Sequence, residues 1–409
     1  MIPRPHRSSF AAPARVCGAA LLLLWLAVWL CSFARDQSCL RALSWLPLWE
    51  RLFVDFTGNY LCSRAWVAGD NPYQVHFVSP FPVTYGYTPQ TLWHFPWCAL
   101  VPSRTAAALM WWALSALIII WGVRASLRTR TDIGLGPLDP VLGLALVLFS
   151  SPVFFELERL NCNSLVLLHV LIAVAALRAR SLPGDLVAGA AIALATWTKI
   201  YPAVLIPALL VLARPRALIF TVAFVGVLGA MDVPGLRQFW HHRRETAPIH
   251  HPSVHGTYDN FMHPLGAWWI LLWEKAGVSV FRRIPEPLVA ALLLAPFLVA
   301  ATRPILNLPV SLRSKLTLPY FLWLVSAGTF MLPIANDYNL LFLPLALLAV
   351  VGPTRTWTLP VLFALSLLWL QPFAIPINGF LMTVLKLCCL AAASVGLRAR
   401  AVAFAGAPS

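Results

Sequence analysis

The stretch that decides the fold is Ser103–Val123, which reads SRTAAALMWWALSALIIIWGV and contains a single charged residue, Arg104. A helix of about 20 mostly apolar residues is long enough to cross the hydrocarbon core of a membrane. The whole chain of 409 residues shares this character, because 60% of its residues are hydrophobic and only 11% are charged. Soluble domains carry roughly 25% charged residues. The composition therefore excludes a water-soluble globular enzyme and predicts an all-α polytopic membrane protein.

Further apolar stretches predict about 12 transmembrane helices in a single integral membrane domain over residues 1–409. The predicted spans are residues 15–33, 103–123, 138–153, 163–178, 184–199, 200–213, 217–231, 286–302, 317–334, 338–352, 356–372 and 378–397. The two spans that meet at Lys199–Pro202 are alternatively one broken helix. The first span follows Arg4, Arg7 and Arg15 and resembles a signal peptide. Since no small-residue cleavage site follows it, we predict a retained anchor.

The formal net charge of +15 and its distribution predict which side each loop occupies. With the N-terminus inside, the short basic loops all fall inside, as the positive-inside rule requires, and they include the residues Arg124, Arg128 and Arg178. The long segments 34–102 and 232–285 then lie outside, and we expect the function there, since functional residues gather on loops held by a rigid scaffold. The basic residues form no stripe with interleaved aromatic residues, so we expect no binding of nucleic acid.

The first long segment predicts a helix over residues 48–68, which contain no proline. Its apolar side chains recur at three- or four-residue steps, as in a helix that lies along a membrane surface. They are Trp45, Leu48, Leu52 and Phe56. Arg51, Asp55 and Asn59 follow one another on another face, and the turn-forming residues 69–72 end the helix. Asp55 is therefore predicted either at the boundary of water and lipid or as a surface carboxylate paired with Arg51.

Five motifs follow one another along the chain. They are Asp55-Phe56 with Tyr60, Ala65 and Gly69-Asp70-Asn71-Pro72-Tyr73; Tyr87-Thr88-Pro89; Leu160-Asn161-Cys162-Asn163; Lys199-Ile200-Tyr201-Pro202; and Pro333-Ile334 with Asp337. In this order they resemble the polyprenyl-phosphate-sugar-dependent membrane glycosyltransferases of carbohydrate-active family 87. That family belongs to the GT-C superfamily and includes bacterial α-1,2-mannosyltransferases. Thr88 stands where the family usually has proline, and Leu160 and Asn161 replace the first two residues of its Gly-Gln-x-Asn motif.

The resemblance implies transfer of a hexose, mannose-like, from a polyprenyl-phosphate sugar to a hydroxyl of a glycolipid or glycan acceptor. The transfer would proceed with inversion at the outer face of the cell membrane. A phosphate leaves without a proton donor, so one general base is enough, unlike the two carboxylates of glycosidases. The resemblance gives this role to Asp55, the family's first-loop aspartate. Asp70 is the second candidate, although its Asp-Asn-Pro context is typical of a turn.

Two cations are candidates for the donor phosphate, because fixed positive charges stabilise a leaving phosphate best where water is scarce. Lys199 lies at the end of an apolar span, where it either binds the phosphate or extends to the lipid headgroups. Arg159 either binds the phosphate or pairs with Glu156 and Glu158. The other predicted donor-phosphate or substrate-binding residues are Asn161, Asn163, Tyr87, Tyr201 and Asp337.

Histidines gather in the second long segment, and their spacing fits no zinc pattern. They are His241, His242, His250, His251, His255 and His263. We expect a metal-independent enzyme without a cofactor, in which these side chains either bind donor phosphate or face water; a metal held by some of them is the alternative. Residues 264–285, rich in tryptophan, predict a second interfacial helix. In the first long segment Cys39, Cys62 and Cys98 are either free thiols or include one disulfide.

The predicted partners are the polyprenyl-phosphate sugar, the glycolipid or glycan acceptor, and membrane lipid. Two other classes of function stay open. A lipid or solute transporter or flippase predicts charged residues that converge at mid-membrane from several spans, whereas in the predicted spans only Lys386 lies that deep. A catalytically silent scaffold is the third class.

Overall fold

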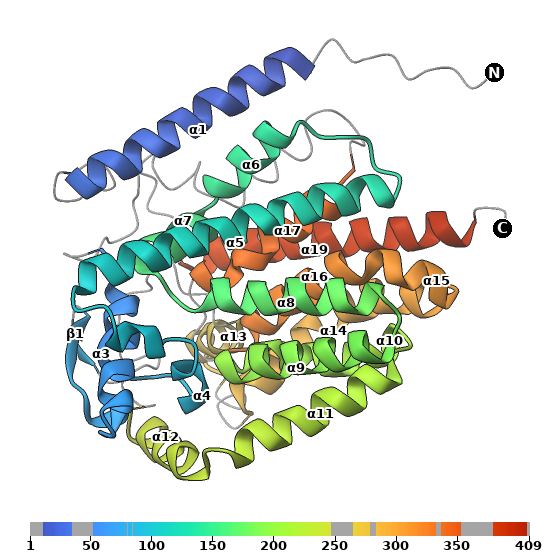
Figure 1. Cartoon of the computed structure of the whole chain (residues 1–409). Helices are drawn as coiled ribbons and strands as arrows, with labels where there is room; N and C mark the ends of the chain where they lie inside the picture. Colours follow the sequence, from blue (N-terminus) through green and yellow to red (C-terminus); the bar gives the residue numbers. More distant parts are fainter. Residues whose placement is uncertain are drawn as a thin grey trace.

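The computed structural model describes residues 11–34, 52–79, 81–83, 85–246, 265–278, 284–332, 337–352 and 379–406. In these residues four helices are long and apolar enough to cross a membrane (Figure 1). They are α1 (Ala11–Ala34), α5 (Arg104–Asp132), α14 (Glu286–Leu306) and α19 (Gly379–Ala405). The number rises to six if two bent helix pairs each form one span. These pairs are α6 (Pro140–Leu148) with α7 (Ser151–Arg159), bent by 62°, and α11 (Pro215–Ala230) with α12 (Val233–Thr246), bent by 84°.

The predicted helical class is confirmed, and these apolar helices fit a membrane protein. The predicted number of 12 spans is not confirmed, because several of the predicted stretches form helices shorter than a full span. The predicted span 356–372 lies outside the described residues. The shorter helices are α8 (Asn163–Arg178), α9 (Leu182–Thr198), α10 (Leu205–Val211) after the 3-10 turn η3 (Tyr201–Val204), α16 (Thr317–Phe330) and α17 (Phe342–Val350).

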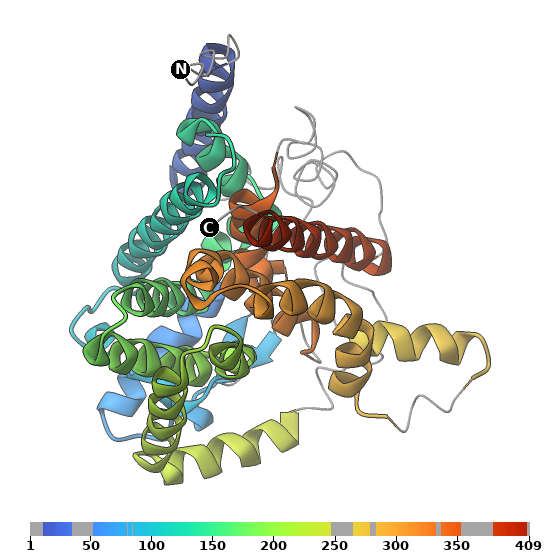
Figure 2. The same cartoon turned by 90° about the vertical axis from the view of Figure 1, so that its right-hand side faces the viewer.

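Two of these short helices, α16 and α17, form the interior of the bundle. Every residue of α16 and α17 is buried, and α16 packs against α17, η3 and α19. α9 packs between α8 and α11, while α1 lies at the margin of the molecule against α6 (Figures 1 and 2). α9 ends at Thr198, Lys199 is extended, and η3 begins two residues later at Tyr201. The junction predicted at Lys199–Pro202 is therefore a break between two helices.

A small layer covers one end of these helices, and it is built mostly from the first long segment (Figure 1). It contains α3 (Val54–Val67), η1 (Pro72–Gln74), strands β1 (Phe77–Ser79) and β2 (Phe81–Val83), α4 (Pro89–Leu92) and η2 (Pro96–Ala99). The strands pair antiparallel, with Phe77 opposite Val83. α12 packs against α4 and η1 and so closes the layer from the side of α11. The remaining elements are α13 (Leu265–Lys275), α15 (Val310–Arg313), η6 (Ser314–Leu316) and η7 (Asp337–Leu341).

The predicted apolar stripe of the first-segment helix is wrong for Phe56, which is fully buried instead of facing lipid. Its ring packs near Phe95 and Trp97, at centroid distances of 6.2 Å each, in a cluster that includes Trp111 of α5. The later part of the same segment thus supplies the apolar surface that covers this face. Cys62 and Cys98 are free thiols, as one of the two predictions had it. Trp45, Leu48, Arg51 and Cys39 lie outside the described residues.

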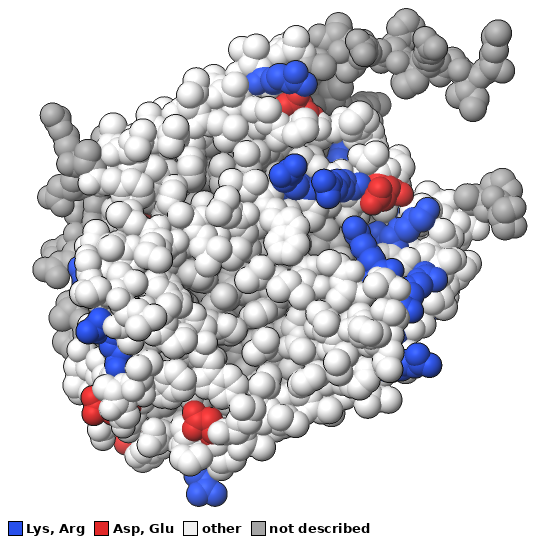
Figure 3. Space-filling view, viewed as in Figure 1, with Lys and Arg blue, Asp and Glu red and all other residues white. Residues whose placement is uncertain are grey.

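The end of the bundle opposite α3 is the more basic one (Figure 3). Several arginines there bond the carbonyl ends of neighbouring helices. Arg130 donates to the carbonyls of Leu348 and Val351 at 3.3 and 2.6 Å, and Arg313 donates to that of Val211 at 2.8 Å. Because the last carbonyls of a helix lack partners within it, such contacts both satisfy them and complement the helix dipole. These arginines tie α17 and α10 to their neighbours.

Candidate active site

Asp55 lies in the first turn of α3 and is held by two side chains from the α7–α8 junction. Arg159 Nη2 donates to Oδ1 at 2.6 Å, and Arg159 Nε donates to Oδ2 at 3.1 Å. Asn161 Nδ2 donates to Oδ2 at 2.7 Å. The side chains of Arg159 and Asp55 are 10% and 11% exposed. The carboxylate therefore sits in a two-pronged, largely desolvated ion pair with Arg159, a geometry that fixes its orientation.

The backbone around this pair explains why the two residues meet. Phe53 adopts a left-handed conformation with φ of 67°, and its N–H donates to the carbonyl of Glu158 at 2.9 Å. This bond fastens the start of α3 to the end of α7. Leu160 then ends α7 in a second left-handed conformation, with φ of 54°. That turn directs Asn161 back toward Asp55.

The left-handed turn falls at one departure from the family motif, Leu160. Glycine adopts positive φ without strain, whereas another residue there costs roughly 1–2 kcal/mol. Leu160 takes the place of the motif's glycine, and its side chain is fully buried in the cluster around Phe56 and Trp111. Burial of this side chain offsets the strain.

Asn161 and Asn163 extend the site into a hydrogen-bonded chain. Asn161 Nδ2 also donates to the hydroxyl of Tyr87 at 2.7 Å. Asn163 Nδ2 donates to Glu156 Oε2 at 2.9 Å, and the hydroxyl of Tyr201 donates to Asn163 Oδ1 at 2.6 Å. Glu156 therefore bonds Asn163 and the backbone N–H of Ser164, not Arg159, so this part of the predicted alternative ion pair is wrong.

Glu158 likewise makes no ion pair with Arg159, and both of its carboxylate oxygens are buried without a hydrogen-bond partner among the described residues. Arg159 nevertheless lies close enough to stabilise the charge of Glu158, and Asp55 close enough to oppose it. A buried carboxylate without hydrogen bonds is costly and often marks a functional site.

Lys199 faces the same site from the break between α9 and η3. Its Nζ lies 4.5 Å from the centroid of the Tyr87 ring, and the residue is partly buried. Asp55 and Glu156 act to stabilise its charge, while Arg243 acts against it. The lysine is therefore held over an aromatic face inside the site. The predicted alternative, a side chain that extends to the headgroups, is wrong. An ammonium over a tyrosine ring is itself a favourable contact.

Tyr87 is held in place by the segment that follows it. Thr88 Oγ1 donates to the carbonyl of Trp197, and Thr91 Oγ1 donates to that of Thr198 at 3.2 Å. Both carbonyls lie at the end of α9, beside Lys199. Thr88, the residue that departs from the family's proline, therefore supplies a hydroxyl that fixes α4 to α9. Sequence reasoning missed this contact, because it joins residues far apart in the chain.

Tyr85 and His94 also lie near the site, and only His94 was missed by the sequence analysis. The Tyr85 ring meets the Tyr87 ring edge-on at 5.4 Å. The Tyr85 hydroxyl has no hydrogen-bond partner in the described part of the chain, and its burial raises the pKa well above the usual value. His94 lies 3.3 Å from Thr198 Oγ1 through Nε2 and 5.1 Å from the ring of His169. Burial lowers the pKa of His94 to about 4, so its ring is neutral at pH 7.

Arg243 is another residue near the site that the sequence analysis missed. Phe239 of α12 packs near Tyr73, with ring centroids 6.2 Å apart, in a cluster with Tyr85. Arg243 follows Phe239 by four residues and so lies on the same side of the helix. Among the described residues no carboxylate lies within ion-pair distance of Arg243, yet it is close enough to act on the charge of Lys199. The basic amphipathic pattern of α12 was the available signal.

The other predicted residues are placed only in part. Asp337 begins η7, which packs against α7, but its side chain lies outside what the structure describes. Asp70 is exposed. His241 pairs with Glu245 at 3.3 Å on the surface, whereas the predicted histidines from His250 to His263 lie outside the described residues. Within the described ranges no three His, Cys, Asp or Glu side chains form a group that could hold a metal.

Fold and site together define a class: a helical protein of the membrane type with a carboxylate–guanidinium site at one end of its bundle. Residues 85–246 match the sequence model of glycosyltransferase family 87. This interval contains Tyr87, Arg159, Lys199 and Arg243, and it begins after Asp55. The match supports this family and a glycosyltransferase activity, and it does not favour a transporter. No curated protein and no solved structure matches the chain.

Proposed function

We propose that the protein transfers a hexose, mannose-like, from a polyprenyl-phosphate sugar to a hydroxyl of a glycolipid or glycan acceptor. The observation that carries the proposal is the ion pair of Asp55 with Arg159, which joins the first long segment to the interval that matches glycosyltransferase family 87. An enzyme of this kind needs a carboxylate and cations in one site, where a lipid donor and an acceptor meet.

In the proposed reaction Asp55 takes the proton of the acceptor hydroxyl. A carboxylate has about four lone-pair positions, and Arg159 and Asn161 fill three of them. The fourth, on Oδ1, is left for the acceptor. As this proton moves to Asp55, the acceptor oxygen attacks the anomeric carbon and the bond from that carbon to the phosphate oxygen breaks. Arg159 then stabilises the carboxylate while the acceptor is bound and keeps it aimed.

The polyprenyl phosphate leaves with the electron pair of the broken bond, and nearby cations stabilise its added charge. Lys199 and Arg243 suit this role, because they approach the site from α9 and from α12 and repel each other in the absence of an anion. A phosphate between them would replace that repulsion with two favourable contacts. Tyr87 and Tyr85 offer ring faces for the sugar or the isoprenoid chain.

We further propose about 12 spans with both termini inside, and a site at the outer face of the cell membrane. The basic end of the bundle lies opposite α3 (Figure 3), so the positive-inside rule would orient the layer with Asp55 outward. The short apolar helices would complete the spans where other helices shield them from lipid, since a buried helix has no need to match the bilayer thickness alone.

Sugar transfer by membranes that carry Asp55→Asn tests the proposal. General-base catalysis is worth roughly 100- to 10,000-fold, so we expect transfer from polyprenyl-phosphate mannose to fall at least 100-fold at normal protein level. Asp70→Asn is the matched control, because Asp70 is exposed and lies beyond the end of α3. Near-normal transfer by the Asp55 variant, or an equal loss in the control, would refute the assignment of the base.

A further inference from the structure

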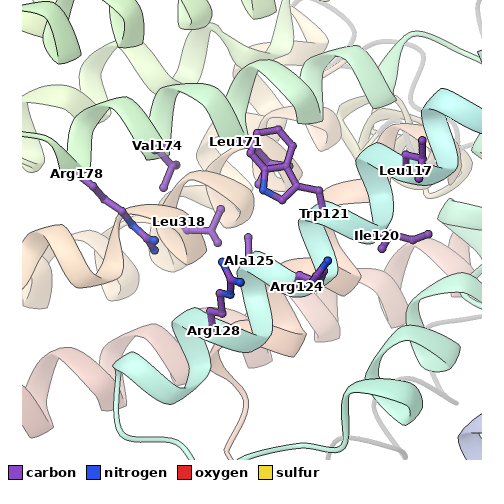
Figure 4. Close-up of a pocket in the computed structure, with 11 residues that line it drawn as sticks. Leu117, Ile120, Trp121, Arg124, Ala125, Arg128, Leu171, Val174, Arg178 and Leu318 are labelled. Carbon is purple, nitrogen blue, oxygen red and sulfur yellow. The ribbon is translucent and has the colours of Figure 1, made fainter.

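A groove of about 480 Å³ lies between α5, α8 and the start of α16 (Figure 4). It is lined by Leu117, Ile120, Trp121, Arg124, Ala125, Arg128, Leu171, Val174, Ala175, Arg178 and Leu318. Arg178 and the active-site residue Asn163 are the last and first residues of α8. At 1.5 Å per residue this helix separates them by roughly 22 Å.

The groove combines an apolar wall with three guanidinium groups. Leu117 and Trp121 are 63% and 42% exposed, so large apolar side chains stay uncovered along one half. Arg124 and Arg128 follow on α5, and Arg178 extends from α8 on the other side (Figure 4). Arg178 Nη2 donates to Thr129 Oγ1 at 3.3 Å. In the described part of the chain no carboxylate lies within 4 Å of any of these three guanidinium groups.

We propose that this groove binds one anionic phospholipid of the surrounding bilayer, with its phosphate among Arg124, Arg128 and Arg178 and an acyl chain along Leu117 and Trp121. Guanidinium groups bind phosphate oxygens in two-pronged geometry, and basic pockets between membrane helices bind anionic headgroups. The apolar wall selects a lipid over a free phosphate, because uncovered leucine and tryptophan gain nothing from an inorganic ion. The inference does not depend on the proposed transfer reaction.

The bound lipid would pin α5 to α8. Both helices also contribute to the active-site end, since Asn163 begins α8 and Trp111 of α5 packs in the cluster with Phe56. An anionic lipid at the basic end is therefore expected to stabilise the fold as a whole, with an effect on thermal unfolding that no zwitterionic lipid reproduces.

Native mass spectrometry of the purified full chain in detergent, titrated with phosphatidylglycerol or phosphatidylcholine, tests the proposal. The variant R124Q/R128Q/R178Q removes the three groove charges. R216Q/R303Q/R398Q is the matched control, because it removes three exposed arginines outside the groove. We expect phosphatidylglycerol to bind the wild type and the control alike and to bind the groove variant about 100-fold more weakly.

Equal binding by the two triple variants, equal binding of phosphatidylcholine, or displacement by inorganic phosphate at the concentration of the lipid would overturn the proposal. Ala175→Trp provides a second arm in case the triple variant fails to fold, since it fills the groove and leaves all three guanidinium groups in place. We expect this variant to lose at least tenfold in affinity for phosphatidylglycerol, and unchanged binding would contradict the assignment of the acyl-chain wall.

Discussion

Replacing Arg159 with glutamine removes the charged guanidinium group, which donates two of the three side-chain hydrogen bonds that Asp55 accepts. Removing one partner of a buried ion pair costs about 3–5 kcal/mol, because the remaining charge stays desolvated. Both side chains keep about a tenth of their surface exposed and Asn161 still donates. The lower end of that range, about 3 kcal/mol, is therefore the expected loss of unfolding free energy.

The double variant Asp55→Asn with Arg159→Gln separates this loss from a simple loss of packing. Two neutral amides can bond each other and Asn161, so the double variant is expected to be more stable than the sum of the single losses by about 2 kcal/mol. Denaturant unfolding in detergent micelles, followed by tryptophan fluorescence, measures all four proteins. A loss below about 1 kcal/mol for the Arg159 variant, or a double variant that is strictly additive, would refute the reasoning.

Three further predictions concern the backbone strain at Leu160, the cation Arg243 and the buried His94. Leu160→Gly should be more stable than Leu160→Ala by about 1 kcal/mol, because glycine is unstrained at the φ of 54° found there. Leu157 is the control, since it is helical and fully buried, and there the alanine variant should be more stable than the glycine variant by about the same amount. The same order at both sites would contradict the left-handed turn. Arg243→Gln should raise KM for the lipid donor about tenfold with little loss of stability. The control variant Arg244→Gln changes an exposed neighbour and should leave KM unchanged. Finally, the pKa of His94 is lowered from 6.5 to about 4, so between these values the unfolded chain binds a proton at this residue and the folded chain does not. The contribution of His94 to folding stability is therefore full above pH 6.5, and stability falls as the pH drops toward 4. His94→Gln should flatten that part of the pH dependence, by at most about 3 kcal/mol, and an unchanged profile would show that His94 takes no part in it.

The sequence predicts those features that local chemistry determines. The break at Lys199–Pro202 follows from proline after a lysine at the end of an apolar stretch. The helix around Asp55 follows from spacing and the turn at residues 69–72, but the predicted start is wrong at Leu52 and Phe53, which form a turn because Phe53 is left-handed. The apolar stretches also predict helices, but not how many reach across a membrane. α16 and α17 are buried by their neighbours, so their hydrophobicity reflects packing inside protein as well as contact with lipid.

What the sequence could not predict depends on contacts between distant residues. Asp55 meets Arg159 across 104 positions, and only the left-handed turns at Phe53 and Leu160 bring them together. Phe56 turns inward because Phe95 and Trp97, much later in the same segment, offer it a cover. The contribution of α12 needs the 84° bend after α11, which returns a basic helix to the site. A turn at Asp232, whose Oδ1 accepts from the N–H of Gly235 at 2.9 Å, was the local signal for that bend.

The most direct test of the account is sugar transfer by the purified protein in liposomes, supplied with polyprenyl-phosphate mannose or with a nucleotide-linked mannose. We expect product only from the lipid-linked donor, and none above background when Asp55→Asn replaces the wild type. Transfer from the nucleotide sugar, or product formation that does not require the Asp55 carboxylate, would contradict the central claim.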